Sequence, residues 1–288
     1  MAWILSGFAD EAGATADEQI AAIQNAGFRY IDVRSIDGYN VSQLPLDHAR
    51  QLRDRFDAAG IQVLFLGTPI GKVDITDDFE QELDRLDHAI AVAQIFGTNC
   101  IRIFSYFNKT NISMSQWQAE ALRRLRTLRN RAADKQMTLY HENERFIFGD
   151  RLEQVLEIVH DLRDGESFRT IFDFDNFTQS GDDPWRNWEH LRDATDAIHL
   201  KESDAQGQHV PVGNGIGRVK EILSDALSRG WEGPLSLEPH LSRSPAVLAT
   251  GPHGVANQKL SDLTPAETFQ VAAEQAKSLL VSINAPIH

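Results

Sequence analysis

The sequence predicts a single closed (β/α)₈ barrel that spans residues 1–288. Short apolar runs rich in β-branched and aromatic residues alternate with longer segments of helical periodicity, and eight such pairs can be counted. A length of 288 residues is also typical of this architecture. The rival fold is an open, doubly wound sheet. It is not favoured, because SGFADEAGATADE, which includes the end of the first predicted strand, lacks the glycine-rich turn of dinucleotide-binding sheets.

The predicted strands are the places where apolar, β-branched and aromatic residues are most concentrated. Strands of a parallel barrel are covered on both faces, so short and nearly continuous apolar runs are expected there. In chain order, the predicted strands are residues 3–9, 30–35, 62–67, 100–106, 137–141, 169–174, 197–201 and 235–238.

The predicted helices are the longer segments in which apolar residues recur with helical spacing. Glycines follow four of them, where a helix commonly ends in a left-handed residue: Gly27, Gly60, Gly97 and Gly230. In chain order, the predicted helices are residues 15–26, 47–59, 78–96, 116–135, 150–162, 184–192, 218–229 and 265–283.

Two glycine-containing connections stand out. VGNGIG, residues 212–217, comes well after the seventh predicted strand, which indicates a turn at the barrel mouth and only a weak case for phosphate binding. Residues 240–262 form a long connection rich in Gly, Pro and Ser. Loops of that length in compact domains tend to be lids or contact segments. We therefore expect this loop to close over the barrel mouth or to reach a neighbouring subunit of a homo-oligomer.

The charge balance argues against two classes of partner. Lys plus Arg number 28 against 42 Asp plus Glu, and a net charge of −14 repels nucleic-acid backbones. The first residues, MAWILSGFADEAG, lack a basic stretch and reach acidic residues before a membrane span or signal peptide could form. Cys100 is the only cysteine and cannot form an internal disulfide, so a cytoplasmic setting and a buried, inert thiol are expected.

One basic run is explained by a solvated helix face. Leu122, Leu125 and Leu128 are spaced three apart, as on the apolar side of an amphipathic helix. The arginines among them should then face water and need no nucleic acid: Arg123, Arg124, Arg126, Arg129 and Arg131.

Four polar residues occupy equivalent positions at the ends of the last four predicted strands: Glu142, Asp173, His199 and Glu238. They recur at about the length of one strand and helix unit, and a barrel places its site at the C-terminal ends of its strands. Side-chain alternation then puts a mostly apolar or small layer beneath them, formed by Tyr140, Ile171, Ala197 and Ser236.

Three converging carboxylates repel one another unless a cation lies between them. Together with an imidazole they form a mixed oxygen and nitrogen site, without the thiolates of a closed structural zinc site. The sequence therefore predicts one divalent metal ion, Mn, Zn, Co or Mg, held by Glu142, Asp173, His199 and Glu238.

Several motifs resemble one family along nearly the whole chain. HEN at 141–143, FDFDN at 172–176, IHLKES at 198–203, LSLEPHL at 235–241 and the N-terminal SGFADE and AGFRYIDVRSIDGYNV are similar to the xylose isomerase-like TIM barrels, in their sugar phosphate isomerase/epimerase branch. The resemblance implies that the same four residues hold the metal, as in ketose 3-epimerases, inosose isomerases and hydroxypyruvate isomerase. This chain departs from many of those epimerases at Asn176, where they carry a histidine.

The expected activity is isomerisation or epimerisation of a ketose, keto-cyclitol or related carbohydrate. A C–H next to a metal-bound oxygen becomes acidic, because the cation holds the charge of the enediolate that is left. Glu142 and Glu238 lie on opposite sides of the metal and are the predicted acid/base pair. The resemblance implies that the same two residues are also metal ligands.

Five further residues are candidates for contact with the substrate: Lys201, His240, Asn176, Arg34 and Arg102. Most have a simpler alternative, since Lys201 could pair with Glu202 or Asp204, and His240 and Arg102 with a loop carboxylate. His141 should point outward and pack or hydrogen-bond, and Asp175 is a candidate partner for His199. Glu144 is expected to start the loop that follows.

Three other functions are weighed against this one. A 3-keto-glycoside lyase would form the same enolate next to a leaving group, and the sequence does not separate the two. An apurinic-site endonuclease needs extra histidines after strands two and three, and VRSIDGY and LFLGTPI offer none. A non-catalytic sugar-binding barrel should have lost a metal carboxylate, whereas all four ligands are present.

Overall fold

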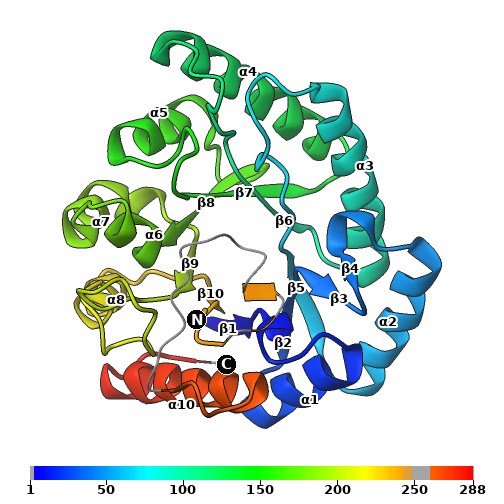
Figure 1. Cartoon of the computed structure of the whole chain (residues 1–288), viewed down its shortest axis with the longest axis vertical. Helices are drawn as coiled ribbons and strands as arrows, with labels where there is room; N and C mark the ends of the chain where they lie inside the picture. Colours follow the sequence, from blue (N-terminus) through cyan, green and yellow to red (C-terminus); the bar gives the residue numbers. More distant parts are fainter. Residues whose placement is uncertain (1–2, 243, 245, 248–259, 288) are drawn as a thin grey trace.

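The structure is a computed structural model that describes residues 3–242, 244, 246–247 and 260–287. Eight parallel strands form a nearly closed barrel with helices packed around it, so the predicted (β/α)₈ fold is confirmed (Figure 1). The strands follow the order β1-β10-β9-β8-β7-β6-β5-β2, and β1 also contacts β2, which brings the two ends of the sheet together.

All eight predicted strands are present, most of them shorter at their C-terminal ends. The predicted end residues leave the hydrogen-bonded ladder and form the loops of the barrel mouth. The strands are β1 (Ile4–Gly7), β2 (Tyr30–Val33), β5 (Gln62–Leu66), β6 (Cys100–Ile103), β7 (Thr138–Glu142), β8 (Phe168–Asp173), β9 (Ala197–Leu200) and β10 (Pro234–Leu237).

The eight predicted helices are also confirmed. Thr15 and Thr264 form capping boxes at the starts of the first and last, while Gly27 and Gly97 end two of them at φ 68° and 73°. The helices are α1 (Ala16–Ala26), α2 (Leu46–Ala58), α3 (Phe79–Phe96), α4 (Met114–Ala133), α5 (Leu152–Leu162), α7 (Pro184–Leu191), α8 (Val219–Ser228) and α10 (Pro265–Ser282). Among the described residues, no helix is long and apolar enough to cross a membrane.

Short elements that the sequence reading missed shape the mouth. A hairpin of β3 (Ser35–Ile36) and β4 (Tyr39–Asn40) follows β2, and its turn places Asp37 and Gly38 at φ 52° and 84°. Such an Asp-Gly pair is a known hairpin signal. A short helix, α6 (Phe174–Gln179), begins directly after β8, where the Asp173 side chain accepts a hydrogen bond from the Asn176 N–H at 2.8 Å. Among the described residues, 3₁₀ turns are also found at η1 (Ala9–Glu11), η2 (Val41–Gln43) and η3 (Arg192–Ala194).

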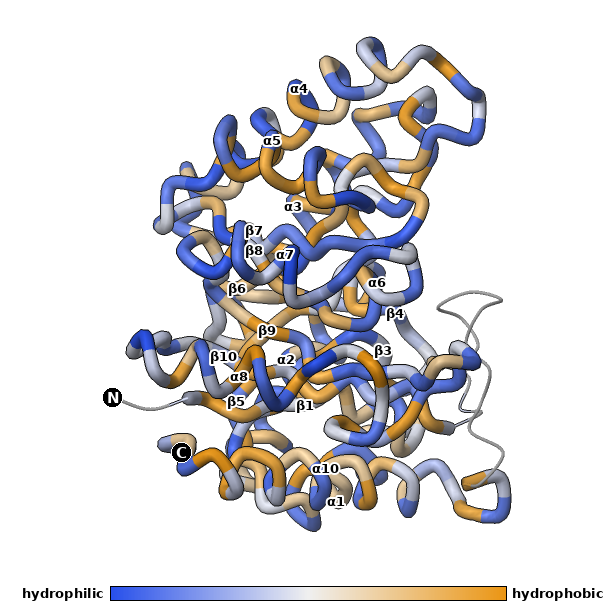
Figure 2. Tube along the Cα trace, turned by 90° about the vertical axis from the view of Figure 1, so that its left-hand side faces the viewer, coloured by the Kyte–Doolittle hydropathy of each residue, from blue (hydrophilic) through white to orange (hydrophobic). Residues whose placement is uncertain are grey.

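The barrel interior beneath the mouth has the predicted composition. Tyr140, Ile171 and Ala197 form one buried cluster with Phe65, as expected from side-chain alternation. Cys100 is half-buried against this cluster, and burial raises the pKa of its thiol, which suits an inert cysteine. Figure 2 shows hydrophobic stretches in the region of the strands.

The fourth predicted member of that layer, Ser236, belongs to a small polar group. Its Oγ lies 3.2 Å from Ser6 Oγ, and Ser6 donates a hydrogen bond to Asp32 at 2.6 Å. Burial raises the pKa of Asp32 to about 6, against the lowering effect of these hydroxyl groups. The barrel floor is therefore apolar on one side and polar on the other.

The arginine run lies on α4 as predicted, with one exception. Leu125 and Leu128 are buried, but so is Arg124, which was expected to face water. Arg124 donates to Glu120 Oε1 at 2.7 Å and to the Asp77 carbonyl at 2.9 Å. Its guanidinium therefore bridges α4 and the loop before α3, which the helical period alone does not predict.

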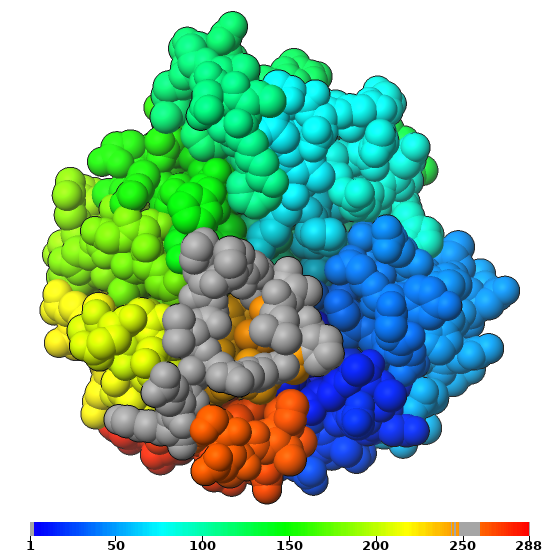
Figure 3. All heavy atoms as spheres, viewed as in Figure 1, coloured from blue at the N-terminus to red at the C-terminus, as the bar shows by residue number. Residues whose placement is uncertain are grey.

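The predicted lid, residues 240–262, falls mostly outside the described residues, because 243, 245 and 248–259 are not described. Its described start, from His240 to Ser242, is buried. Figure 3 shows the face seen in Figure 1, with successive described segments following one another around the rim in chain order.

Candidate metal centre

Four strand ends bring the predicted metal ligands to one level of the barrel. Glu142 and Asp173 are the last residues of β7 and β8, and His199 lies in β9, where it pairs in register with Asp173. Glu238 follows β10 directly, and its backbone N–H donates to the Leu200 carbonyl at 3.2 Å. The ladder of the sheet thus fixes the heights of all four side chains.

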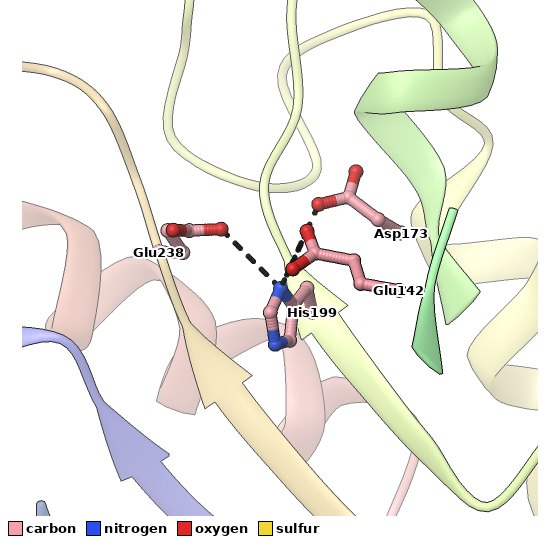
Figure 4. A group of neighbouring side chains, drawn as sticks. All are labelled: Glu142, Asp173, His199 and Glu238. Atoms are coloured by element: carbon pink, nitrogen blue, oxygen red, sulfur yellow. Dashed lines mark hydrogen bonds and ion pairs between the residues drawn. The ribbon is translucent and has the colours of Figure 1, made fainter. Parts of the chain in front are cut away.

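The four side chains point toward one another (Figure 4). His199 Nδ1 lies 3.2 Å from Glu142 Oε1, 3.3 Å from Glu238 Oε2 and 3.7 Å from Asp173 Oδ2. One ligand atom from each residue lies within 4.8 Å of all the others, and all four residues are buried. This is the donor set that the sequence predicted for one divalent cation.

Burial and mutual attraction shift the pKa of each group. Burial opposes charge on His199, but the neighbouring carboxylates, Glu142 first, raise its pKa well above the usual value. Burial also acts to raise the pKa of Glu142 and of Glu238, but both values are lowered. For Glu142 the attraction of His199 and Arg102 outweighs burial. For Glu238 the attraction of Lys201 and His199 does so. For Asp173 burial prevails and raises the pKa.

Lys201 faces the metal centre. Its Nζ lies 3.0 Å from Asp173 Oδ2 and 3.6 Å from Glu238 Oε2. Burial acts against its charge, but Asp173 and Glu238 raise its pKa well above the usual value. The alternative pairing with Glu202 or Asp204 is wrong, because Lys201 continues the inward parity of His199 past the end of β9.

Two arginines hold the outer oxygens of the glutamates. Arg102 Nη1 lies 3.2 Å from Glu142 Oε2 and 3.4 Å from Glu238 Oε1. Arg34 Nη1 lies 2.7 Å from Glu238 Oε1, and its other nitrogens pair with Asp10. The oxygens that face His199 are Glu142 Oε1 and Glu238 Oε2, so each glutamate has one oxygen toward the centre and one toward an arginine.

The ion-paired network around the centre has an excess of negative charge. It contains six carboxylates, Asp10, Glu11, Glu142, Glu144, Asp173 and Glu238, and four Lys or Arg side chains, Arg34, Lys72, Arg102 and Lys201. Two negative charges therefore need either protons, one of which the raised pKa of His199 allows it to carry, or a divalent cation. Glu142 Oε2 and Asp173 Oδ2 are buried, and each is held by an ion pair, with Arg102 Nη1 at 3.2 Å and Lys201 Nζ at 3.0 Å. The donor types, their spacing and this charge excess all fit a divalent metal ion.

A cavity of about 120 Å³ opens next to the centre. Its charged and imidazole lining consists of Arg34, Lys72, Arg102, Glu142, Glu144, Lys201, Glu238 and His240. Four of the five predicted substrate residues are in this set. The fifth, Asn176, lies in α6, and its Nδ2 donates to Glu142 Oε1 at 3.3 Å and to the Asn143 carbonyl at 2.9 Å. Asn176 therefore contacts a metal-ligand candidate but does not itself line the cavity.

Glu144 and Lys72 line the cavity but were not singled out as site residues. They pair at 2.8 Å, and burial, which raises the Glu144 pKa, is outweighed by Lys72, which lowers it. Glu144 does begin the loop after β7 as expected, yet its side chain turns into the mouth. The two residues lie far apart in the sequence, and no motif connects them.

His240 is fixed by a carboxylate from the first loop. Glu11 accepts hydrogen bonds from the His240 backbone N–H at 2.7 Å and pairs with its ring Nδ1 at 2.8 Å, while His240 adopts φ 51°. Glu11, Glu238 and His240 form a second group with ligand atoms within 4.8 Å. Arg34 already pairs with both of these glutamates, so a cation is present at that position.

The predicted contact between Asp175 and His199 is wrong. Asp175 pairs with His209 Nδ1 at 3.2 Å and accepts a hydrogen bond from the Ser203 hydroxyl. Because α6 begins at Phe174, Asp175 no longer follows the alternation of β8 and turns away from the centre. Burial acts to raise the pKa of Asp175, but the hydrogen bond and charge of His209 outweigh it and lower this pKa to about 2.

The glycine loop 212–217 binds a carboxylate of the chain itself. Glu202 accepts hydrogen bonds from the backbone N–H groups of Gly213, Gly215 and Gly217, at 2.6, 3.2 and 2.9 Å. A Cβ on Gly215 would lie 2.3 Å from the Ser203 carbonyl oxygen, so a side chain does not fit there. The loop is thus a turn at the mouth, as predicted, and its anion-binding groups are occupied.

His141 packs behind the centre as expected. Its Nε2 lies 2.9 Å from Ser105 Oγ, and its ring stacks on Phe168. Burial lowers the pKa of His141 to about 4 from 6.5. A folded-state pKa below the unfolded one means that this histidine stabilises the fold fully above pH 6.5, and that the contribution is lost as pH falls toward 4.

The His141→Gln variant tests that pH dependence. The free energy of unfolding of wild type minus that of the variant should fall by about 2 kcal/mol from pH 7.5 to pH 5. At the lower pH only wild type takes up a proton at residue 141 when it unfolds. Urea unfolding at the two pH values measures the difference. Parallel changes in both proteins would show that His141 is not buried in its neutral form.

Comparison with known proteins agrees with the fold. The profile of the family described as xylose isomerase-like TIM barrel matches residues 20–259. No curated protein sequence matches the chain.

Solved structures share the fold at low sequence identity. The IOLI protein, solved with a bound zinc atom, superposes with a TM-score of 0.72 at 15% identity, over 98% of this chain and 99% of that one. The 3-keto-D-glucoside 4-epimerase YcjR from E. coli gives 0.70 at 14%, over 98% and 100%. The probable 3-DHS dehydratase AsbF from Bacillus anthracis gives 0.69 at 17%, over 96% and 99%. At these identities the similarity establishes the fold alone.

Proposed function

Because the chain belongs to the xylose isomerase-like TIM barrel family, we propose that it is a divalent-metal-dependent isomerase or epimerase of a ketose, keto-cyclitol or related carbohydrate. The observation that carries the proposal is the buried group of Glu142, Asp173, His199 and Glu238, with one ligand atom from each within 4.8 Å of the others. Its excess of negative charge calls for a divalent cation, and the cavity beside it has room for a small molecule.

A divalent cation bound there would hold the negative charge that develops on a substrate oxygen when the neighbouring C–H loses its proton. Glu142, Asp173, His199 and Glu238 would bind that cation. Their positions at the ends of four adjacent strands make the group rigid, because the sheet register fixes each backbone.

Glu142 and Glu238 are our acid/base pair, since both line the cavity and come from different strands. Arg102 contacts one oxygen of each. When one glutamate takes a proton, its attraction to Arg102 weakens and the guanidinium can strengthen its contact with the other. A proton leaving one face of the substrate carbon and another arriving at the opposite face would then be linked through a single cation.

Lys201 and His240 also line the cavity and are our candidates for orienting the substrate. The Lys201 ammonium, which remains protonated, can donate to a substrate oxygen while it holds Asp173. A β-eliminating lyase on a 3-keto-glycoside would use the same first proton transfer. A similar fold is found in the probable 3-DHS dehydratase AsbF. The two reactions differ in product and not in the group that starts them.

Solvent deuterium uptake tests the proposal. Protein reconstituted with Mn²⁺ is incubated in D₂O with ketoses, inososes and 3-keto-glycosides, and products are examined by NMR and mass spectrometry. We expect deuterium at one carbon next to a carbonyl, with a changed configuration or carbonyl position. Loss of the glycosyl group would identify the lyase instead. No exchange into any member, in protein that has bound its metal, would contradict the proton-transfer mechanism.

A further inference from the structure

We propose that the substrate of this site is an uncharged carbohydrate, without a phosphate or carboxylate group. This inference rests on the proposed function and narrows its substrate class. It follows from three observations: the cations of the cavity are already paired, the glycine loop already binds a carboxylate, and the site already has an excess of negative charge.

Each lysine and arginine that lines the cavity already has a carboxylate partner. The shortest contacts are Arg34 to Glu238 at 2.7 Å, Lys72 to Glu144 at 2.8 Å, Lys201 to Asp173 at 3.0 Å and Arg102 to Glu142 at 3.2 Å. A substrate anion could take one of these cations only by leaving its partner carboxylate buried and unpaired. Breaking a buried pair in this way is strongly unfavourable, because it leaves an uncompensated charge inside the protein.

The one phosphate-like backbone cradle of the mouth is filled. In the described part of the chain, the N–H groups of Gly213, Gly215 and Gly217 converge on the carboxylate of Glu202, at 2.6 to 3.2 Å. Such converging N–H groups are a common way to bind phosphate. Here they bind an internal anion that is covalently tied to the end of β9, which a substrate phosphate would have to displace.

A bound divalent cation would leave the network electrically balanced, because six carboxylates face four Lys or Arg side chains. A phosphate dianion would restore the excess of two negative charges inside a buried site. The whole chain, at −14, also repels anions as they approach. Hydroxyl groups add no charge and can both donate to the carboxylates and accept from the guanidinium groups.

Arg102 offers a donor of this kind. Its Nε is buried and has no hydrogen-bond partner among the described residues, although its Nη1 is held by two glutamates. Arg102 lines the cavity, so a small shift of its side chain would let a hydroxyl or carbonyl oxygen accept from this N–H without breaking either ion pair.

Titration of Mn²⁺-loaded protein with inorganic phosphate and with acetate tests the inference without turnover. Wild type should show no saturable binding below about 10 mM. Glu144→Gln releases Lys72 from its partner and should gain phosphate affinity by at least tenfold. Glu274→Gln, on the exposed face of α10, removes the same charge far from the cavity and should behave as wild type. Saturable binding of either anion to wild type below about 10 mM would overturn the inference.

Matched substrates separate this inference from the proposed function. D-fructose and D-fructose 6-phosphate, with other such pairs, are compared for deuterium uptake. The neutral member of a reactive pair should exchange at least about 100-fold faster, the equivalent of the roughly 3 kcal/mol lost when a buried pair is broken. Faster exchange of the phosphorylated member would overturn the substrate class and leave the proton-transfer function standing. Absence of exchange throughout would reject the function, while the anion titration still decides whether the cavity accepts charge.

Discussion

Glu142→Gln and Glu238→Gln proteins are expected to lose their divalent metal, whereas wild type carries about one ion per chain. Each substitution removes one oxygen charge from a group of four donors that lie within 4.8 Å of one another. Changes to residues that only support metal ligands already cost about 10–100-fold in affinity, so the loss of a ligand should exceed that range. Plasma mass spectrometry of the purified proteins, with Mn²⁺ or Zn²⁺ supplied during reconstitution, measures the metal content.

Glu144→Gln is the matched control for this experiment. Glu144 lies two residues beyond Glu142, lines the same cavity and pairs with Lys72, but it is not in the donor group. Its variant should keep the metal. If all three variants keep it, the assigned donor set is wrong. A wild type that remains metal-free with Mn²⁺ and Zn²⁺ in excess would contradict the catalytic mechanism and favour a non-catalytic sugar-binding barrel.

The donor group could be predicted from the sequence because it depends on a regular repeat. Glu142, Asp173, His199 and Glu238 each stand at the end of a short apolar run, and a closed parallel barrel places such ends at one height. Period-two alternation then decides which side chains face inward, and Tyr140 and its neighbours in the layer beneath obey it. Nothing beyond strand identity was needed for these positions.

The residues that the sequence reading missed lie where that regularity ends. Asp175 was misassigned because α6 starts inside the expected strand and rotates its side chain toward His209. Glu144 and Lys72 come from loops whose paths no periodicity describes, and their pairing joins two distant segments. A signal was available for Glu11, which follows β1 in FADEAG at the same edge of the barrel as the four ligands.

The charges of the mouth also explain why single residues could not be assigned from sequence. Arg34 contacts Asp10, Glu11 and Glu238, which come from two ends of the chain. A motif reports which charged residues occur, but the partner of each depends on loop geometry around a closed ring. Which charged residues meet at the mouth is therefore known only from the three-dimensional structure of the closed barrel.

Arg102→Gln is expected to slow deuterium exchange by at least about 100-fold while the metal is retained, the size of effect seen when one preorganised charge-stabilising group is removed from a site. Arg102 contacts the outer oxygens of both Glu142 and Glu238 and none of their inner oxygens. Loss of its charge should raise the pKa of both glutamates. The base must be unprotonated to act, so the acid limb of the rate profile should move to higher pH. Rates measured between pH 5 and pH 9, beside the metal content of each sample, give both readouts.

Two further variants make the Arg102 experiment decisive. Arg169→Gln removes an arginine from the start of β8, where it donates to the Tyr140 hydroxyl at 2.8 Å, and should leave rate and pH profile unchanged. Arg102→Lys restores the charge but lacks the second nitrogen that donates to the Gly67 carbonyl at 3.3 Å and fixes the group in place, so it should recover the pH profile and only part of the rate. Exchange within threefold of wild type in Arg102→Gln would refute the link between the two glutamates. Loss of metal in the same variant would show instead that Arg102 holds the ligands in place.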